Sequence, residues 1–356
     1  MPQLKDAGGP MQTRTATRRP SLRDVAQRAG VSAAAVSYVV NGRLTEVGAG
    51  TCTRIQEAIK ALRYQPQRRG LSLRLNREFA IGLIIVDQNT NFLADPFTTE
   101  VATGLSNELT GPGYGLTVTG CRDIADLERL LGRPIGVDAF VIIASGSRNT
   151  RKRIYGLVAE QNRPVAILQE DIPSGIEDGC AIFQDDHGGA KALTRHLVEH
   201  GAKRFLFVKP ACAWPAIERR ERGIRSALSH GCVLRAIRCN ELDFDETAEA
   251  IDQALRPGKL PDAVMGANDQ IAIAALRVLS RRGIAVPEAM QVTGYNDFAF
   301  RNYVMPRLTT VASQANEIGR RAARLLLSRL DSGAFAERRV ELAVTLDLCG
   351  TSGANG

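Results

Sequence analysis

Apolar residues between positions 21 and 63 recur at helical spacing and predict three short helices around one small core. Ser21 and Ser32 stand where the first two helices begin and are the expected N-caps. Gly30 lies between these helices and can adopt the left-handed conformation that ends a helix. Two helices joined by a short glycine-containing turn fit a helix-turn-helix, although any small three-helix bundle has the same periodicity. The expected inward side chains are Leu22, Val25, Ala26, Ala29, Val36, Val39, Val40, Ile55, Ala58, Ile59 and Leu62.

After residue 76, apolar runs rich in β-formers begin to alternate with amphipathic helical runs. Such alternation predicts βαβ units around parallel sheets. The number of units is too large for one small domain, so we expect an α/β core of two Rossmann-like lobes behind an all-α helix-turn-helix head. Because ligands of such sheets bind beyond the carboxyl ends of the strands, the cleft between the lobes is the expected pocket. The strand-like runs are FAIGLIIV, YGLTVTG, AFVIIAS, PVAILQ, RFLFVK, AVMGAND and QVTGYND.

These patterns divide the chain into five parts. They are a disordered basic tail (1–20), the head (21–64), a hinge (65–76), the core (77–348) and a final tail (349–356). Within the core, the first lobe is expected over about 77–183 plus 312–332, and the second over about 184–311 plus 338–348.

The positive charge is concentrated at the start of the chain. Residues 1–76 hold 13 Lys or Arg against 4 Asp or Glu, a formal charge of +9, whereas the remaining 280 residues hold 33 against 34, a charge of −1. A small basic module in front of a nearly neutral body is typical of a protein that binds a polyanion such as nucleic acid. On charge alone, a solvated basic tail explains the numbers equally well.

The sequence predicts no membrane span, no disulfide framework and no cofactor. No apolar run approaches the roughly 20 residues that cross a bilayer, and the segment MPQLKDAGGPMQTRTATRRP lacks the apolar part of a secretory signal. The seven cysteines are scattered without a C-x-x-C pair and indicate neither disulfides nor a zinc site. The expected location is the cytoplasm.

Two stretches resemble enzyme motifs. HLVEH at 196–200 fits the H-x-x-E-H pattern of zinc proteases, but a histidine next to Gly201 is also typical of a helix C-terminus. GPGYG at 111–115 precedes a strand, whereas a dinucleotide fingerprint follows one. We therefore expect no catalytic residue, no metal and no enzymatic activity.

Ordered motifs along residues 21–348 closely resemble the LacI/GalR family of transcription regulators. SLRDVAQRAGVSAAAVSYVVNG resembles the head of that family, and DPFTTEV, ERRERGIRSAL, GANDQIAIAALRVL and VTGYNDFAFRNYVMPRLTTV resemble four motifs of its body. The resemblance implies a DNA-binding head, a hinge, and an effector-binding core related to the type I periplasmic sugar-binding proteins. Members of the family usually act as dimers.

The resemblance also implies which residues contact DNA. The second helix would lie in the major groove, with Ala33, Ala34 and Tyr38 at the base edges, where alanine offers only apolar contact. Tyr38 stands where many members have an arginine that can bind guanine. In the hinge, Leu73 matches a leucine that the family inserts into the minor groove. The residues expected to contact phosphates are Ser21, Ser32, Ser37, Asn41, Arg68 and Arg69.

In the core, the same resemblance implies a set of effector-binding residues, namely Phe97, Arg148, Asp185, Trp214, Arg220, Asn268 and Asn296. Arg220 matches an arginine that binds hydroxyls or carboxylates through its planar fork. Asn296 stands where the family usually has Asp. Losing that negative charge beside Arg220 favours an anionic effector such as a sugar acid over a neutral sugar.

The predicted function is a dimeric DNA-binding regulator, a repressor of a pseudo-palindromic operator, that a sugar or sugar acid in the cleft controls by changing lobe closure. Whether the ligand induces or co-represses stays open. The C-terminal segment lacks a heptad leucine helix, so we expect a dimer without a further assembly built from that segment. The alternative is a small-molecule-binding protein or cleft enzyme whose basic head is incidental.

Overall fold

The computed structural model describes residues 20–40, 42–64, 75–89, 91–255 and 260–353. The chain divides into two compact units between Arg77 and Glu78, and each unit is considered by itself. The predicted basic tail over 1–19, Asn41 and hinge residues 65–74 lie outside the described residues.

The first unit contains the predicted three-helix head. Ser21 begins α1 with a reciprocal capping box, in which Asp24 N donates to Ser21 Oγ (3.3 Å) and Ser21 N donates to Asp24 Oδ2 (2.6 Å). Gly30 ends the helix at a φ of 64°, in the left-handed region that favours glycine. Val25, Val36 and other apolar residues of all three helices form one buried cluster. The elements are α1 (Leu22–Ala29), α2 (Ala33–Val40), the 3₁₀ turn η1 (Leu44–Glu46) and α3 (Ala49–Leu62).

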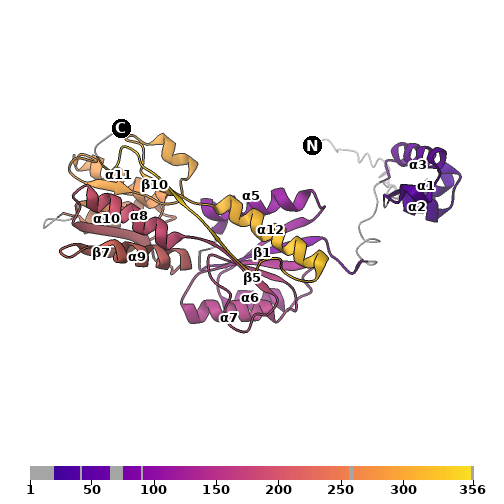
Figure 1. Cartoon of the computed structure of the whole chain (residues 1–356), viewed down its shortest axis with the longest axis horizontal. Helices are drawn as coiled ribbons and strands as arrows, with labels where there is room; N and C mark the ends of the chain where they lie inside the picture. Colours follow the sequence, from indigo (N-terminus) through magenta and orange to yellow (C-terminus); the bar gives the residue numbers. More distant parts are fainter. Residues whose placement is uncertain (1–19, 41, 65–74, 90, 256–259, 354–356) are drawn as a thin grey trace, which may run out of the picture. The chain divides into compact units, whose positions relative to one another are not determined.

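The first lobe of the second unit is a six-stranded parallel sheet in the order β11-β5-β4-β3-β1-β2. Helices α5 and α12 cover one face and α6 and α7 the other (Figure 1). Strands buried on both faces need apolar residues at successive positions, as in AFVIIA of β3. The elements are β1 (Ala80–Val86), η2 (Phe92–Ala94), α5 (Pro96–Thr110), β2 (Gly115–Cys121), α6 (Ile124–Leu131), β3 (Ala139–Ala144), α7 (Arg148–Ala159), β4 (Val165–Leu168), β5 (Gly179–Gln184), α12 (Ala315–Ser332) and β11 (Arg339–Leu342).

The second lobe has a four-stranded parallel sheet in the order β7-β6-β8-β9 and an antiparallel ribbon of β10 and β12. Its apolar core joins the sheet to α8, α9, α10 and α11. The elements are α8 (Asp186–Glu199), β6 (Arg204–Pro210), α9 (Pro215–Ala227), β7 (Val233–Cys239), α10 (Phe244–Ala254), β8 (Ala263–Gly266), α11 (Asp269–Arg281), β9 (Gln291–Thr293), η3 (Ala299–Tyr303), β10 (Thr310–Ala312) and β12 (Thr345–Asp347).

The chain passes between the lobes in three places, from β5 to α8, from β10 to α12, and from β11 to β12 (Figure 1). Gln184 joins two of these crossings: its Oε1 accepts from Ser313 Oγ at 3.0 Å and its Nε2 donates to Asp186 Oδ1 at 3.0 Å. Both bonds lie where the first sheet ends, so they fix the base of the cleft.

The predicted fold class is confirmed, with two changes of detail. Residues 338–348 were assigned to the second lobe, but β11 pairs in parallel with β5 at the edge of the first sheet, and only β12 belongs to the second lobe. The final tail begins later than expected, because Thr351 and Ser352 are buried in the second lobe, where Thr309 N donates to Thr351 Oγ1 at 2.8 Å.

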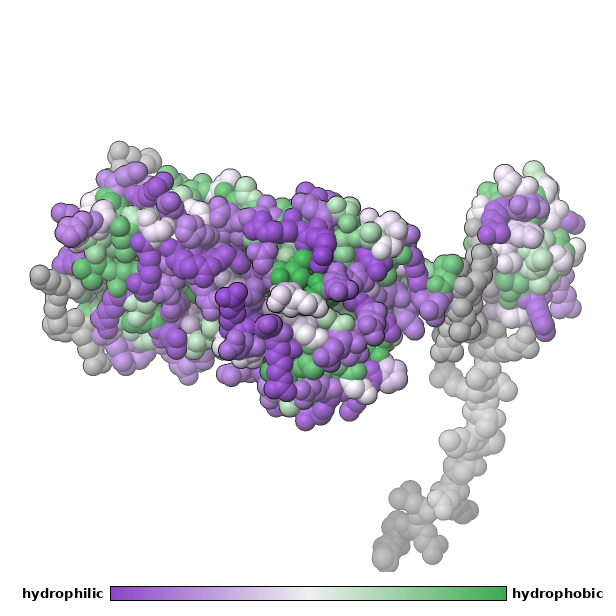
Figure 2. Space-filling model, turned by 60° about the horizontal axis from the view of Figure 1, so that its bottom comes forward, coloured by the Kyte–Doolittle hydropathy of each residue, from purple (hydrophilic) through white to green (hydrophobic). Residues whose placement is uncertain are grey.

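The surface carries no continuous apolar belt on the face seen in Figure 2, where hydrophobic residues gather in separate small patches among hydrophilic ones. Within the described residues, none of the helices combines the length and the apolar character that crossing a membrane requires.

Candidate functional site

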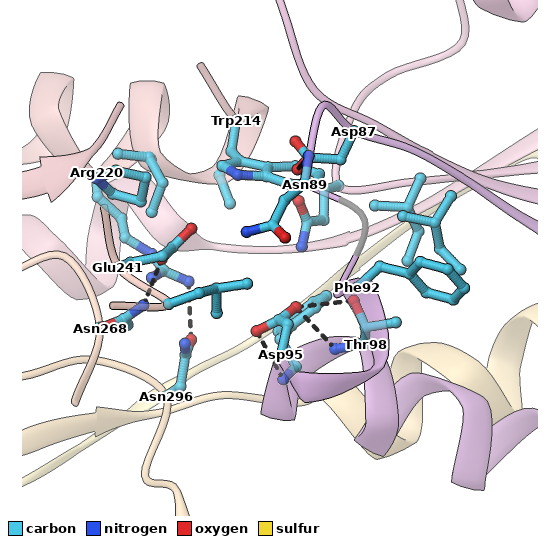
Figure 3. A pocket seen from close by; sticks show the side chains of 18 residues that line it. Asp87, Asn89, Phe92, Asp95, Thr98, Trp214, Arg220, Glu241, Asn268 and Asn296 are labelled. Carbon is cyan, nitrogen blue, oxygen red and sulfur yellow. Dashed lines mark hydrogen bonds between the residues drawn. The ribbon is translucent and has the colours of Figure 1, made fainter. Parts of the chain in front are cut away.

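A cavity in the core takes its lining from both lobes (Figure 3). The first lobe contributes Asp87, which follows β1, and Asp95 and Phe97 at the start of α5. The second contributes Trp214, which precedes α9, and Asn268, which follows β8. The carboxyl ends of parallel strands meet at one edge of each sheet, and this is why segments far apart in the sequence reach the same space.

Arg220 is the buried cation of this cavity, with 3 % of its surface exposed. Each guanidinium nitrogen donates a hydrogen bond: Nε to Asp186 Oδ1 (2.9 Å), Nη1 to the Ala267 carbonyl (2.6 Å) and Nη2 to Asn296 Oδ1 (2.9 Å). The guanidinium also lies 3.7 Å from the centre of the Tyr295 ring, a cation–π contact. Asp186 pairs with Arg220 and, at 3.4 Å, with Arg219, and this fixed network holds the guanidinium of Arg220 at the cavity wall.

Three carboxylates, those of Asp87, Asp95 and Glu241, face the cavity from different sides (Figure 3). Glu241 Oε2 accepts from Asn268 Nδ2 at 2.7 Å. Burial, together with the negative charges of Asp95 and Asp87, raises the pKa of the Glu241 carboxyl to about 8. Glu241 is therefore largely protonated at neutral pH.

Asp95 combines a local structural role with its place in the cavity. Its carboxylate caps α5, accepting from Phe97 N (3.3 Å), Thr98 N (3.1 Å) and Thr98 Oγ1 (2.8 Å). Burial raises the pKa of Asp95, the charge of Asp87 adds to the rise, and the hydrogen bonds from Thr98 and Phe97 oppose it. The cap therefore holds a carboxylate at a fixed point of the cavity wall.

Apolar side chains complete the cavity. Phe92, Phe97 and Ile143 come from the first lobe, and Trp214 and Ile217 from the second. Trp214 packs against the apolar cores of both lobes. Walls of this kind around a few polar groups are typical of small-molecule sites.

Five of the seven residues predicted to bind an effector line this cavity: Phe97, Trp214, Arg220, Asn268 and Asn296. The other two do not. Arg148 is exposed at the first position of α7. Asp185 caps α8, where it accepts from Gly188 N at 2.7 Å.

Arg151 stands one turn beyond Arg148 and joins the two lobes at the side of the cleft. Its Nε donates to Glu170 Oε2 of the first lobe at 2.8 Å, and its Nη2 donates to Glu218 Oε2 of α9 in the second lobe at 3.1 Å. A backbone bond from Gly146 N to the Ala213 carbonyl (2.8 Å) crosses beside it. Arg151 does not line the cavity, so the inward-facing arginine of α7 links the lobes and does not replace Arg148 as a residue of the lining.

The sequence analysis missed the acidic residues of the cavity. Asp95 lies inside the motif DPFTTEV, and Asp87 follows a predicted strand, so the rule that strand ends meet could have identified both. Glu241 follows β7, a strand that was not anticipated. Asp87 and Asp95 in the lining weaken the charge argument for a sugar acid, because they restore negative charge that is missing at Asn296.

In the head, α2 presents a small uncharged surface. Ala33, Ala34 and Tyr38 are exposed and Ser37 is half-buried, whereas Val36 and Val39 turn into the core. Ser32 caps the helix, its Oγ accepting from Ala35 N at 3.2 Å. Ala34 and Tyr38, four positions apart, share one face of the helix, and Ala33 lies beside them in the first turn. Arg68, Arg69, Leu73 and Asn41 lie outside the described residues.

The HLVEH stretch forms the end of α8. His196 Nε2 is 2.9 Å from Ser352 Oγ, and His200 Nδ1 is 2.7 Å from the His196 carbonyl oxygen. Across the part of the chain that the structure describes, no three His, Cys, Asp or Glu side chains are placed to hold a metal ion.

The chain matches two protein families. Residues 21–67 match the bacterial regulatory proteins of the lacI family, and residues 194–349 match the periplasmic binding protein-like domain. Among curated proteins, the chain is 28% identical over 327 residues to the HTH-type transcriptional regulator CelR of Thermobifida fusca, covering 88% of this chain and 92% of CelR. It is 28% identical over 337 residues to the HTH-type transcriptional repressor PurR of Vibrio cholerae, covering 90% and 95%.

Solved structures of two transcriptional regulators are also similar to this chain. A complex of the transcriptional regulator CelR with cellobiose is 27% identical, with a TM-score of 0.67 over 94% of this chain and 100% of that one. The lac repressor dimer bound to operator and the anti-inducer ONPF is 22% identical, with a TM-score of 0.81 over 95% of this chain and 100% of that one. At that identity the second comparison shows a shared fold.

Proposed function

This chain belongs to the LacI/GalR family of transcription regulators. From that premise we propose that it is a repressor, and that a small molecule in the cleft of its core sets its affinity for operator DNA. One observation carries the proposal: the same chain combines a helix-turn-helix head with a polar cavity that both lobes of a second unit build. The ligand class is a sugar or a close derivative of one.

Control of DNA binding by the ligand would follow from a cavity that both lobes line. A ligand that contacts Asp95 of the first lobe and Arg220 of the second binds more tightly when the lobes close, so it shifts the population towards the closed arrangement. The same closure is favoured without ligand by the Arg151–Glu218 pair. Coupling of this kind is reciprocal, so DNA binding changes ligand affinity by the same factor.

The head reads DNA through apolar contact. Ala33, Ala34 and Tyr38 would face base edges, where alanine can contact only a thymine methyl or exclude other groups. Ser21, Ser32 and Ser37 would position phosphates with Asn41. Leu73, Arg68 and Arg69 of the hinge would add a minor-groove wedge and further phosphate contacts, so indirect readout carries much of the specificity.

The protein acts as a dimer, and we place part of its interface on an exposed apolar patch of the second lobe. Tyr303 and Met305 are 87% and 91% exposed, and Tyr303 lines one groove together with Phe244 and Phe300. Patches of large apolar side chains at such exposure are normally covered by a partner. A second copy of the chain fits, because a palindromic operator requires two heads.

A regulator of this kind needs no catalytic residue, and we infer that the chain is not an enzyme. Its relatives are transcriptional regulators. Because it acts on DNA, the cytoplasm is its proposed location.

The test is binding-site selection from random DNA by the full-length protein at moderate salt. A pseudo-palindrome with two half-sites is expected, and candidate sugars should change the protein's affinity for it. Selection without enrichment, in the presence and absence of those sugars, would instead support a small-molecule-binding protein with an incidental basic head.

A further inference from the structure

The charges of the cavity are unbalanced. The ionisable residues of its lining are Asp87, Asp95, Glu241 and Arg220. Arg220 pairs with Asp186, which is 1% exposed and lies 2.9 Å from its Nε, and Asp186 also pairs with Arg219 at 3.4 Å. Among the described residues that line the cavity, Arg220 is the one cation beside three carboxyl groups, and its hydrogen bonds go to Asp186, Ala267 and Asn296 instead of to any of the three.

Two buried acceptors of the lining are also unsatisfied. Asp87 and Gln169 are each 8% exposed, and neither Asp87 Oδ2 nor Gln169 Oε1 has a hydrogen-bond partner among the described residues. Burial raises the pKa of the Cys212 thiol to about 11, and the charge of Asp87 and a side-chain hydrogen bond with it add to the rise, so the thiol beside Asp87 stays neutral and is a weak donor. Leaving a buried acceptor unpaired is costly, so a ligand that supplies hydrogen-bond donors would be favoured here.

Hydroxyl groups could satisfy these acceptors, but they would leave the negative charge in place. A protonated amine donates up to three hydrogen bonds and cancels one charge in a site of low dielectric constant. The apolar walls formed by Trp214 and Phe97 suit the carbon face of a ring or chain.

We propose that the effector is a small hydroxylated amine, such as an amino sugar, whose ammonium group binds between Asp87, Asp95 and Glu241. This inference rests on the proposed function, because it specifies the ligand of the same cleft. Arg220 and Asn268 then serve the hydroxyl groups, while the carboxylates select the charged nitrogen.

The protonation of Glu241 provides a second measurable test of an amine as the ligand. Burial is the main cause that raises the pKa of Glu241 to about 8; the charges of Asp95 and Asp87 add to the rise, and the Asn268 hydrogen bond and the charge of Arg220 oppose it. An ammonium ion would oppose it further, so binding at pH 7 should expel the proton that Glu241 holds in the empty cavity.

The experiment compares matched ligands on the full-length protein by calorimetry at pH 7. Glucosamine, galactosamine and mannosamine are titrated beside the parent hexoses and the N-acetylhexosamines, and glucamine beside sorbitol, with gluconate as the anion. At least one amine should bind about tenfold or more tightly than its parent and its acetylated form. Its binding enthalpy should vary with the ionisation enthalpy of the buffer, showing release of up to one proton.

Variants separate charge recognition from folding. Glu241→Gln and Asp87→Asn keep the side-chain shape and should each reduce the preference for the amine about tenfold, whereas Glu249→Gln, at an exposed carboxylate of α10, should leave it unchanged. Equal or tighter binding of a neutral parent, or no binding by any amine of the set, overturns the proposal.

If neutral sugars bind and change DNA affinity, the regulatory function stands and only the amine inference fails. If no ligand alters DNA binding, the proposed control itself fails.

Discussion

Helix α2 of the head and the cavity of the core differ in nearly every physical respect. The exposed face of α2 carries Ala33, Ala34 and Tyr38 and no charged side chain. The cavity instead gathers three carboxylates around a buried guanidinium, and burial with mutual repulsion raises the pKa of Glu241 to about 8. Under the proposed function, the first surface would meet a polyanion with almost no charge of its own, and the second would use concentrated charge to bind a small molecule.

The difference teaches where each surface obtains its affinity. The head lies in a segment with a formal charge of +9, so long-range attraction to DNA would not depend on α2, which we propose discriminates between sequences by shape. Charges outside the cavity cannot serve a ligand in the same way, because screening and distance weaken their electrostatic interaction with it. The charges that bind the ligand must therefore be inside the cavity, at a cost in stability that the ligand offsets.

The largest effect is expected from Arg220→Ala. It removes the shorter of the two ion pairs of buried Asp186, leaving Arg219 at 3.4 Å, and breaking a buried ion pair costs about 3–5 kcal/mol. Calorimetric unfolding should show a destabilised core, with ligand binding lost. Arg222→Ala, two positions along α9 and exposed, should change stability by less than about 0.5 kcal/mol. Equal melting temperatures for the two variants would show that the network around Arg220 contributes little.

Tyr38→Arg tests the other side of the comparison. An arginine at this exposed position can donate two hydrogen bonds to guanine, worth about 1–3 kcal/mol of discrimination. Selection from random DNA should then enrich guanine at one position of each half-site, while the core unfolds as before. Tyr38→Phe, which keeps the apolar ring, serves as the control. An unchanged motif in both variants would remove Tyr38 from base readout.

Glu241→Gln tests the charge of the cavity through pH. The folded protein holds this proton up to about pH 8, whereas the unfolded chain releases it near the ordinary value of 4.5. Wild-type stability should therefore fall between pH 5 and pH 8, and the variant should lose that fall. Relative to wild type, the Tm of the variant should therefore be higher at pH 8, by several °C, since a larger domain gains about 2–4 °C per kcal/mol.

Two controls accompany that measurement. At pH 5 the difference between variant and wild type should shrink, because wild-type Glu241 is then protonated in the folded state. Glu249→Gln should show no pH-dependent difference. A Tm shift of the same size at pH 5 and pH 8 would argue against repulsion within the cavity.

The smallest effect is expected from Glu218→Gln at the side of the cleft. Glu218 has a side chain that is 41% exposed, and Arg151 keeps both oxygens of Glu170, so the loss should be below about 1 kcal/mol. Ligand affinity should fall by less than about threefold, measured by calorimetry on the variant. A larger loss would mean that this pair controls closure more strongly than its exposure indicates.

Local patterns were sufficient for much of the fold. The caps at Ser21 and Ser32, the glycine turn at Gly30 and the alternation of apolar runs with amphipathic helices all act within a few residues. The strands that were missed are β5, β7, β10, β11 and β12; the last three have only three or four residues each, too few to show a pattern. β7 carries Arg235 and Arg238 in an edge strand with one exposed side, and this obscures its apolar pattern.

The sequence by itself determined the helix-turn-helix, the two-lobed class and the identity of five cavity residues, because each rests on neighbours in the chain or on a recognisable motif. Only the tertiary structure decided which charges meet. Asp87, Asp95 and Glu241 are separated by up to 154 positions in the sequence, and the pairing of strands in two different sheets brings them to one cavity. Electrostatic interaction depends on distance through space, and the sequence pattern carries no information about that distance until the sheets are assembled.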